Sequence, residues 1–413
     1  MEKLSDLRFT MDSCNHCGQC KWIMPAKMHG WDFAEMCPIH SFHHFDAYSG
    51  QGLLNIARER LDGKLEYGDG LEELIYSCTA CGACDACCKV VRDIEVLDTI
   101  YALRADCAEH GTLPAALREN AENVKTTHNI YGMPHSDRFA WLPEDFEDDA
   151  DSDTALFVGC SAYRQPEIAL AAIRILKAGG VRFKILREDE WCCGASLWRA
   201  GMVQEAEELI RRNVDTFKNH GIKTVITACA ECFGSFRNGY PRFVDADFET
   251  LHISQVAVGL LEKGKLHLRG VEPAVVTYHD PCMLGRLSEK YVPWKGEIRA
   301  YGLHVPEKQW RRGEHGVYDA PRKLLEAIPG VTLREMVRNK ECGFCCGAPS
   351  KGTDPELARW TREERRREAE ATGAETIVSA CPFCKETLDG DDGPECVDLC
   401  VLLAQCLCEE DGR

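Results

Sequence analysis

The sequence predicts an α/β protein, with a mainly helical N-terminal region followed by two duplicated lobes that each contain a parallel sheet. Short apolar runs alternate with amphipathic stretches from residue 154 onward, and this alternation occurs twice. The 25 cysteines fall mostly into groups, and in the second part of the chain the groups follow apolar runs. The 413 residues provide for two or three domains with sizeable cores.

Composition excludes several classes of protein. The net charge is −18 and there is no dense stripe of lysine and arginine, so a nucleic-acid partner is not expected. No apolar run reaches the ~20 residues that a membrane helix requires. Residues 1–10 lack the apolar core of a signal peptide. We therefore expect a cytoplasmic protein, which could lie at the membrane surface as part of a complex.

The abundance of cysteine has three competing explanations: disulfides, scattered buried thiols and metal ligands. Disulfide frameworks are typical of short secreted chains, and this chain is long. Scattered thiols would show no fixed spacing, whereas most of these cysteines are separated by two or three residues. The pattern favours iron–sulfur or other metal ligation in a reducing compartment.

The first 153 residues are divided into two parts. Residues 1–112 carry two cysteine groups separated by a helical stretch near 53–65, and residues 113–153 are predicted to be a connector. The connector ends in residues 143–153, which contain seven acidic side chains. Such a run is typical of a solvated linker.

The first lobe is predicted to span residues 154–262. Apolar runs at 154–159, 181–186 and 224–227 are expected to be strands, each followed by cysteine. Helical periodicity lies between them and stops at glycines. Because the elements alternate strand and helix, the strands should be parallel with right-handed crossovers.

The second lobe, residues 263–413, repeats this order with strands expected at 274–278, 331–336 and 376–379. The distance from the paired cysteines to the last motif is 36 residues in one lobe and 35 in the other, which indicates duplication. An insertion at 287–314 lengthens the second copy and contains Tyr291, Trp294, Tyr301 and Trp310, which could contact a partner or pack within the loop itself. The charged run 362–370 is predicted to be a solvated helix face, and Cys396 and Cys400 are predicted to lie in an apolar closing helix.

The N-terminal cysteines have the spacing of two cubane [4Fe–4S] clusters. A C-x2-C-x2-C turn supplies three thiolates to one cluster, and in two-cluster ferredoxins the fourth comes from the other run. The first predicted ligand set is Cys14, Cys17, Cys20 and Cys88. The second is Cys78, Cys81, Cys84 and Cys37. Two features differ from the usual run: Cys88 is followed by Lys89 instead of proline, and its neighbour Cys87 is an alternative fourth ligand.

Each lobe contributes five cysteines, one more than a tetrahedral zinc ion or a cubane uses. The first set is Cys160, Cys192, Cys193, Cys229 and Cys232. The second set is Cys282, Cys345, Cys346, Cys381 and Cys384. Two adjacent cysteines do not easily reach one metal ion, so a multinuclear site is expected. In open α/β sheets the carboxyl ends of the strands bind ligands, which would bring both sets to a shared cleft.

These motifs resemble the CCG-domain iron–sulfur proteins, and in particular the D-type catalytic subunit of heterodisulfide reductase. The resemblance rests on C-x31-CCG-x34-C-x2-C in residues 160–232, its looser copy in 282–384, and the double cluster run before them. Residues 279–286 and 316–322 also look like family motifs. The resemblance implies noncubane [4Fe–4S] clusters in up to two five-cysteine sets, which would split a disulfide between them. Zinc at one set, or an altered set, is the alternative left open.

Two functions are compatible with these features. In the first, electrons pass from two cubanes to the lobes and reduce a small disulfide, or travel in reverse when thiols are oxidised. His279 beside Cys282 could then donate a proton to a leaving thiolate; the alternative is that it only forms local hydrogen bonds. In the second, the chain is an electron relay without a disulfide substrate. Both need other redox subunits as partners, such as a membrane cytochrome b subunit, a multihaem cytochrome or a flavoprotein, because the sequence has no dinucleotide fingerprint and no haem motif.

Overall fold

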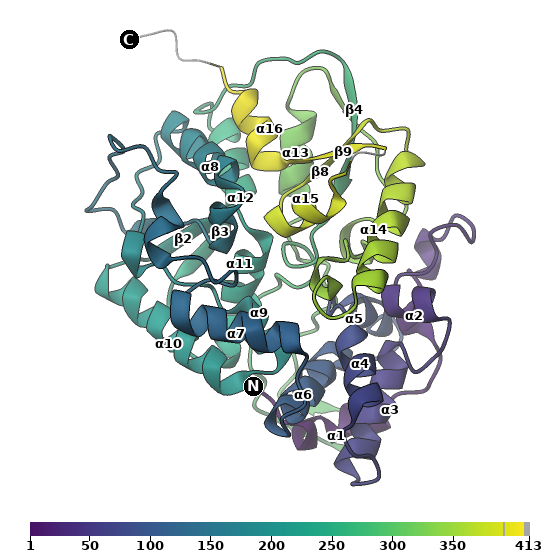
Figure 1. The fold of residues 1–413 in the computed structure, drawn as a ribbon. Helices are drawn as coiled ribbons and strands as arrows, with labels where there is room; N and C mark the ends of the chain where they lie inside the picture. The colour runs from purple at the N-terminus through teal and green to yellow at the C-terminus, as the bar shows by residue number, and fades with distance from the viewer. Residues whose placement is uncertain (391–392, 409–413) are drawn as a thin grey trace.

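A computed structural model describes residues 1–390 and 393–408, and it contains an N-terminal helical unit below two α/β lobes (Figure 1). The helical unit has six α-helices, which pack around a core of leucine, isoleucine and cysteine side chains. Their bounds are α1 (Arg8–Asp12), α2 (Pro38–His43), α3 (Gly50–Leu61), α4 (Asp69–Ser77), α5 (Ala83–Cys88) and α6 (Val96–Glu109).

The connector is more structured than the sequence predicts. It contains helix α7 (Ala115–Thr127), which packs against the first lobe. Its acidic end is hydrogen-bonded along residues 182–185: the backbone N–H of Asp149 donates to Phe183 O at 2.9 Å, and Asp148 Oδ2 accepts the N–H of Ile185 at 2.9 Å. Five of the seven acidic side chains are exposed, as expected of a solvated stretch: Glu144, Asp145, Glu147, Asp151 and Asp153. Asp148 and Asp149 differ, because they bind backbone groups of the neighbouring segment.

The first lobe contains a parallel sheet with strand order β1-β2-β3. The strands are β1 (Thr154–Phe157), β2 (Thr224–Thr227) and β3 (Glu249–His252). The helices are α8 (Pro166–Ala178), α9 (Ala195–Ala200), α10 (Val203–Asn219), α11 (Ala230–Gly234) and α12 (Ile253–Glu262).

The second lobe contains a parallel sheet with strand order β7-β4-β8-β9. Its strands are β4 (Ala274–His279), β7 (Val331–Leu333), β8 (Thr376–Ser379) and β9 (Glu395–Asp398). Its helices are α13 (Asp319–Glu326), α14 (Pro355–Glu370), α15 (Pro382–Leu388) and α16 (Leu399–Gln405). The insertion adds a short antiparallel pair, β5 (Glu297–Ile298) and β6 (His304–Val305).

The duplicated α/β architecture is confirmed, with differences in detail. Strand β7 ends at Leu333 and not at residue 336. Residues 181–186 form a single bridge, Lys184 to Ala155, in place of a full strand. Each lobe ends in a further strand, β3 or β9, that the apolar pattern does not predict. Cys396 therefore lies in a strand and only Cys400 in the closing helix, although both are buried as expected.

The two lobes share one hydrophobic core. Helix α8 of the first lobe packs against α16 of the second, and α13 of the second packs against α12 of the first. Because α8 and α13 occupy equivalent places after the first strand of each repeat, and α12 and α16 after the last, the two contacts are related by the duplication. The lobes thus face each other through equivalent surfaces (Figure 1).

The charged run in α14 is only partly a solvated face, with Glu363, Arg367 and Glu370 exposed. Asp354 caps this helix, with its carboxylate accepting the N–H of Leu357 at 2.9 Å. However, Arg365 is fully buried and Glu368 is 1% exposed. Arg365 follows Leu357 by eight residues and so lies on the same helical face, which is turned toward the core.

Buried ion pairs hold the insertion at 287–314 against the N-terminal unit. Lys89, which replaces the usual proline, is fully buried; it pairs with Glu95 at 2.6 Å and donates to Arg311 O at 3.1 Å. The guanidinium of Arg311 pairs with Glu95 at 3.3 Å and with Asp98 at 3.1 Å. Arg242 of the first lobe pairs with Asp98 at 2.7 Å. This charge cluster joins all three units.

Among the described residues, no helix combines the length and the apolar character needed to cross a bilayer.

Candidate iron–sulfur centres

The structure brings the first predicted ligand set together. Cys14, Cys17, Cys20 and Cys88 line one cavity between the N-terminal loop and helix α5. Cys17 is exposed, whereas Cys20 is buried. Burial raises the pKa of the Cys20 thiol to about 11, with the nearby Cys14 and Cys17 adding to the effect. This set therefore lies at the surface of the molecule.

The second predicted set lies deeper. The pKa of Cys37 is raised well above its ordinary value, by burial first and then by Cys78 and Cys81. Cys84 has the same two thiols among its neighbours. Cys78 Sγ accepts the backbone N–H of Ala80 at 3.4 Å, a bond that suits a thiolate.

A glycine separates the two N-terminal sets. A Cβ at Gly50 would lie 3.0 Å from Cys84 Cβ and 3.3 Å from Cys20 Cβ. Any larger residue would push apart the two segments that carry these cysteines. Gly50 thus permits a close approach between the two sets.

Cys87 does not join either set. Its Sγ lies 3.8 Å from Met36 Sδ, and its thiol hydrogen-bonds to Cys342 of the second lobe. Both thiols are fully buried. Helix α5 directs Cys87 to the interface with residues 340–342, whereas Cys88 faces the cavity of the first set.

The five cysteines of the first lobe form a continuous network. Cys160 follows β1, the pair Cys192–Cys193 precedes α9, and the other two flank the start of α11. The thiols of Cys192 and Cys232 donate to Cys193 and lower the pKa of Cys193 to about 6. Cys160 in turn hydrogen-bonds to Cys192.

The second lobe repeats this network. The thiols of Cys345 and Cys384 donate to Cys346, at 3.4 Å in the case of Cys384, and lower the pKa of Cys346 well below its ordinary value. Cys384 also contacts Cys381. Cys282 lies near Cys346, and burial raises the pKa of the Cys282 thiol to about 12.

The sets form a chain through the molecule. The thiols of Cys81, in the second N-terminal set, and Cys345, in the second lobe, lie close enough to shift each other's pKa. The same is true of Cys381 and Cys229, the residue at the equivalent position of the first lobe. Two thiol pairs, Cys81 with Cys345 and Cys381 with Cys229, thus connect the second N-terminal set to both lobes. Cys20 of the first set and Cys84 of the second lie on either side of Gly50.

Two buried arginines hold the turn of the second N-terminal set against the lobes. Arg286 Nε donates to Cys81 O at 2.6 Å, while its Nη1 donates to the carbonyls of Glu341 and Gly343 at 3.0 and 2.7 Å. Arg199 Nη2 donates to the carbonyls of Thr79 and Ala80 at 3.1 and 3.3 Å. The sequence pattern indicates neither contact, although Arg286 lies in one of the family-like motifs.

Arg286→Met is expected to slow electron passage from the N-terminal sets to the lobes at least tenfold, because it releases Cys81 from the loop that carries Cys345. Losing hydrogen bonds to a charged donor also lowers the free energy of unfolding by about 3 kcal/mol. Freeze-quench EPR after mixing with reduced viologen measures the rate of electron transfer from the N-terminal sets to the lobes. Arg366→Met is the control, since Arg366 is a buried arginine that donates to two carbonyls of its own lobe, those of Leu388 and Pro394. Equal rates in the two variants would contradict this role of Arg286.

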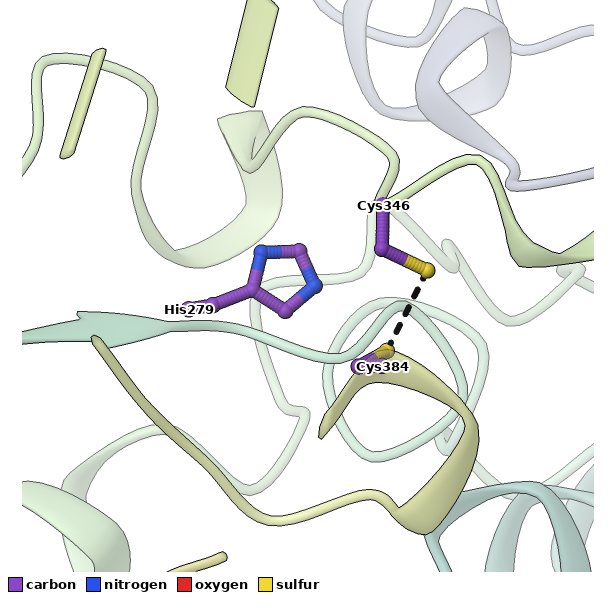
Figure 2. A group of neighbouring side chains, drawn as sticks. All are labelled: His279, Cys346 and Cys384. Atoms are coloured by element: carbon purple, nitrogen blue, oxygen red, sulfur yellow. Dashed lines mark hydrogen bonds between the residues drawn. The ribbon is translucent and has the colours of Figure 1, made fainter. Parts of the chain in front are cut away.

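His279 lies next to the second five-cysteine set. Its ligand nitrogen and the sulfurs of Cys346 and Cys384 all lie within 4.8 Å of one another (Figure 2). Burial and the neighbouring Arg365 lower the pKa of His279 to about 3. The imidazole is therefore neutral at physiological pH.

A cavity of about 300 Å³ lies where the three units meet. Glu231 and Phe383, the third residues of the two Cys-x2-Cys motifs, both line it, and so does Cys78. Arg104, Arg164 and Arg199 also line it, together with Ser196 and Tyr131. The cavity thus has cationic and polar side chains beside both lobes.

The donor sets fit iron–sulfur clusters. All eighteen predicted ligands offer thiol sulfur, the ligand that such clusters require, and they lie in groups of four, four, five and five. The fold and the sites define an iron–sulfur protein with a ferredoxin-type unit and two cysteine-rich lobes.

Comparison with known families gives the same division into a ferredoxin-type unit and two cysteine-rich lobes. The 4Fe-4S dicluster domain matches residues 10–91, and the cysteine-rich CCG domain matches residues 154–237 and 276–389. The chain is 34% identical over 406 residues to the D-type subunit of dihydromethanophenazine:CoB–CoM heterodisulfide reductase from Methanosarcina mazei, covering 95% of this chain and 91% of that protein. The chain belongs to the family of the D-type subunits of heterodisulfide reductase.

More distant relatives share the same parts. EtfAB:quinone oxidoreductase from Syntrophomonas wolfei is 26% identical, over 91% of this chain and 54% of that protein. The B-type subunit of the CoM/CoB fumarate reductase from Methanothermobacter marburgensis is 26% identical, over 84% of this chain and 64% of that protein. The chain is accordingly an iron–sulfur oxidoreductase subunit that transfers electrons with other redox subunits, and its ferredoxin-type unit binds two [4Fe–4S] clusters.

Proposed function

We propose that the protein reduces an organic disulfide in the cavity between its lobes, or oxidises two thiols there in reverse. The contact between Cys229 and Cys381 carries this proposal, because it brings the two five-cysteine sets together. Glu231 and Phe383 extend from the same two motifs into the cavity. A substrate held there would contact residues that stand between the cysteines of both Cys-x2-Cys motifs.

The reaction balances with two electrons and two protons: the S–S bond breaks and two thiols form. A noncubane [4Fe–4S] cluster in each lobe would supply single electrons and a site for sulfur. The ten cysteines of the lobes are the proposed ligands, and they keep the sets buried and close together. The N-terminal sets, with Cys88 and Cys37 as fourth ligands, deliver the electrons.

The side chains that line the cavity are suited to a polar or negatively charged substrate. Arg199 is 7% exposed and Arg104 is 6% exposed, and the Nε of each is without a partner among the described residues. Both guanidinium groups belong to residues of the cavity wall, so their positive charge favours an anionic group on the substrate. Phe383 adds an apolar side chain to the lining.

Electrons would enter at the first N-terminal set, where Cys17 is exposed. We propose as partner a membrane cytochrome b subunit, a multihaem cytochrome or a flavoprotein, and a peripheral position at the cytoplasmic membrane. The relative from Syntrophomonas wolfei is named for its exchange between EtfAB and quinone, which supports a redox partner of this kind.

The proposed function is tested by anaerobic reconstitution, iron and zinc counts, and EPR. The expected result is about sixteen iron atoms, an EPR signal induced by CoM or CoB thiol in the oxidised protein, and two reduced viologens consumed per CoM–S–S–CoB. Cys381→Ala should abolish the thiol-induced signal. About eight iron atoms with bound zinc, or clusters that respond to neither thiol nor disulfide, would overturn disulfide chemistry in favour of the relay.

A further inference from the structure

The surroundings of the two five-cysteine sets differ at one residue. His279 is the last residue of β4; its side chain is 1% exposed, and its ring faces the sulfurs of Cys346 and Cys384 (Figure 2). Figure 2 shows the Nε2 edge of the ring turned toward both sulfurs. The second set therefore has a nitrogen next to its thiols.

The equivalent position in the first lobe is Phe157. His279 pairs in register with Ser379, two residues before Cys381. Phe157 pairs with Thr227, two residues before Cys229. Phe157 is 1% exposed and packs against the ring of Phe236 at 5.0 Å. The first set thus has a hydrocarbon ring where the second has an imidazole.

Arg365 determines which nitrogen of His279 carries the proton. Arg365 Nε donates to His279 Nδ1 at 3.0 Å. A guanidinium has donors only, so Nδ1 must present its lone pair, and the proton of the neutral ring is on Nε2. Arg365 is itself fixed by Glu368 Oε2 at 2.6 Å and by the carbonyl of Arg338 at 2.9 Å. The tautomer is therefore built into the fold.

This tautomer prevents His279 from binding a metal ion. A neutral histidine that ligates through Nε2 carries its proton on Nδ1 and donates it to an acceptor. Arg365 cannot accept that proton. The grouping of one imidazole nitrogen and two thiols, which resembles a zinc site, is thus a hydrogen-bond donor facing two sulfurs.

We propose that the Nε2–H of His279 donates to the ligand sulfurs of Cys346 and Cys384 and raises the reduction potential of the second five-cysteine set above that of the first. A hydrogen bond to a ligand sulfur stabilises the reduced, more negative form of a cluster. Arg365 is the positioning residue. This inference rests on the proposed function, since it requires a cluster in the second lobe.

The consequence concerns the order of electron arrival. The second lobe receives electrons from Cys81 through Cys345, and the first lobe receives them through the contact of Cys381 with Cys229. A higher potential in the second set holds the first electron there until the second arrives. The two halves of the substrate would then meet unequal sets.

His279→Phe tests the inference, because it places the residue of the first lobe in the second. Anaerobic potentiometric titration followed by EPR should show one of the two lobe signals shifted to lower potential, with iron content unchanged. His279→Gln, which retains an N–H donor, should restore most of the potential. Arg365→Met should shift the same signal in the same direction, whereas Arg366→Met should leave it in place.

Other outcomes overturn the inference in distinguishable ways. Unchanged potentials in His279→Phe with full iron content exclude the hydrogen bond. Loss of about four iron atoms in both His279 variants identifies the histidine as a ligand. Equal shifts in the variants of Arg365 and Arg366 indicate a general structural effect. Absence of iron from the second lobe of the unmodified protein contradicts the proposed function itself.

Discussion

Cys88→Ser is expected to remove one N-terminal cluster, about four iron atoms per chain, whereas Cys87→Ser should retain every cluster. Cys88 lines the cavity with the other three members of the first set. Cys87 is directed to Cys342 and Met36 at the interface with the second lobe. The adjacent positions thus have opposite roles, which spacing alone leaves open.

Iron content and EPR of anaerobically prepared variants check this prediction. Cys87→Ser is the matched control, because it makes the same chemical change one residue away. It replaces a fully buried thiol and should lower the free energy of unfolding by about 1 kcal/mol. Loss of iron in Cys87→Ser together with full iron in Cys88→Ser would reverse the assignment.

Arg311→Met should lower the free energy of unfolding by about 3–5 kcal/mol, because it breaks a buried ion-pair cluster from one side. Glu95 and Asp98 are 3% and 4% exposed, and the variant leaves them with one cation fewer. The insertion would then be released from helix α6. Urea unfolding of the anaerobic holoprotein measures the change.

Lys295→Met is the control for Arg311→Met. Lys295 is an exposed cation of the same insertion, so its loss should change stability by no more than about 0.5 kcal/mol. Equal midpoints for the two variants would show that the insertion is not held by the charge cluster.

The same cluster predicts how stability depends on pH. Burial acts to raise the pKa of Glu95, but Lys89, Arg311 and Lys308 together hold that pKa well below its ordinary value. The contribution of Glu95 is therefore fully present above about pH 4.3, the ordinary pKa of glutamate, and is lost as the pH falls toward the folded value. Arg311→Met should reduce this acid-dependent part of the stability.

Strands were predictable where apolar runs are dense. The bounds of β2 and β8 agree with the runs 224–227 and 376–379, because β-branched residues fill them and both faces are covered. Strand β3, Glu249–His252, has too few apolar residues to stand out. It is fixed by its pairing with β2, which depends on the tertiary fold.

The grouping of the cysteines was predictable from spacing, but the contacts between groups were not. No local sequence pattern predicts that Cys81 lies near Cys345 or that Cys229 lies near Cys381, because more than 100 residues separate the members of each pair. The burial of Arg365 was not predictable, because it lies in a run of charged residues. Its distance of eight residues from Leu357 is the one local sign that it faces inward.

The paired contacts between the lobes have the arrangement of two copies related by a two-fold axis. Helix α8 meets α16 as α13 meets α12, and Cys229 meets the residue that is its own counterpart, Cys381. Such reciprocity is the property of an isologous dimer with two-fold symmetry. A single-lobe homodimer, once fused into one chain, could then change each half separately, as the differences between Phe157 and His279 and between Glu231 and Phe383 illustrate.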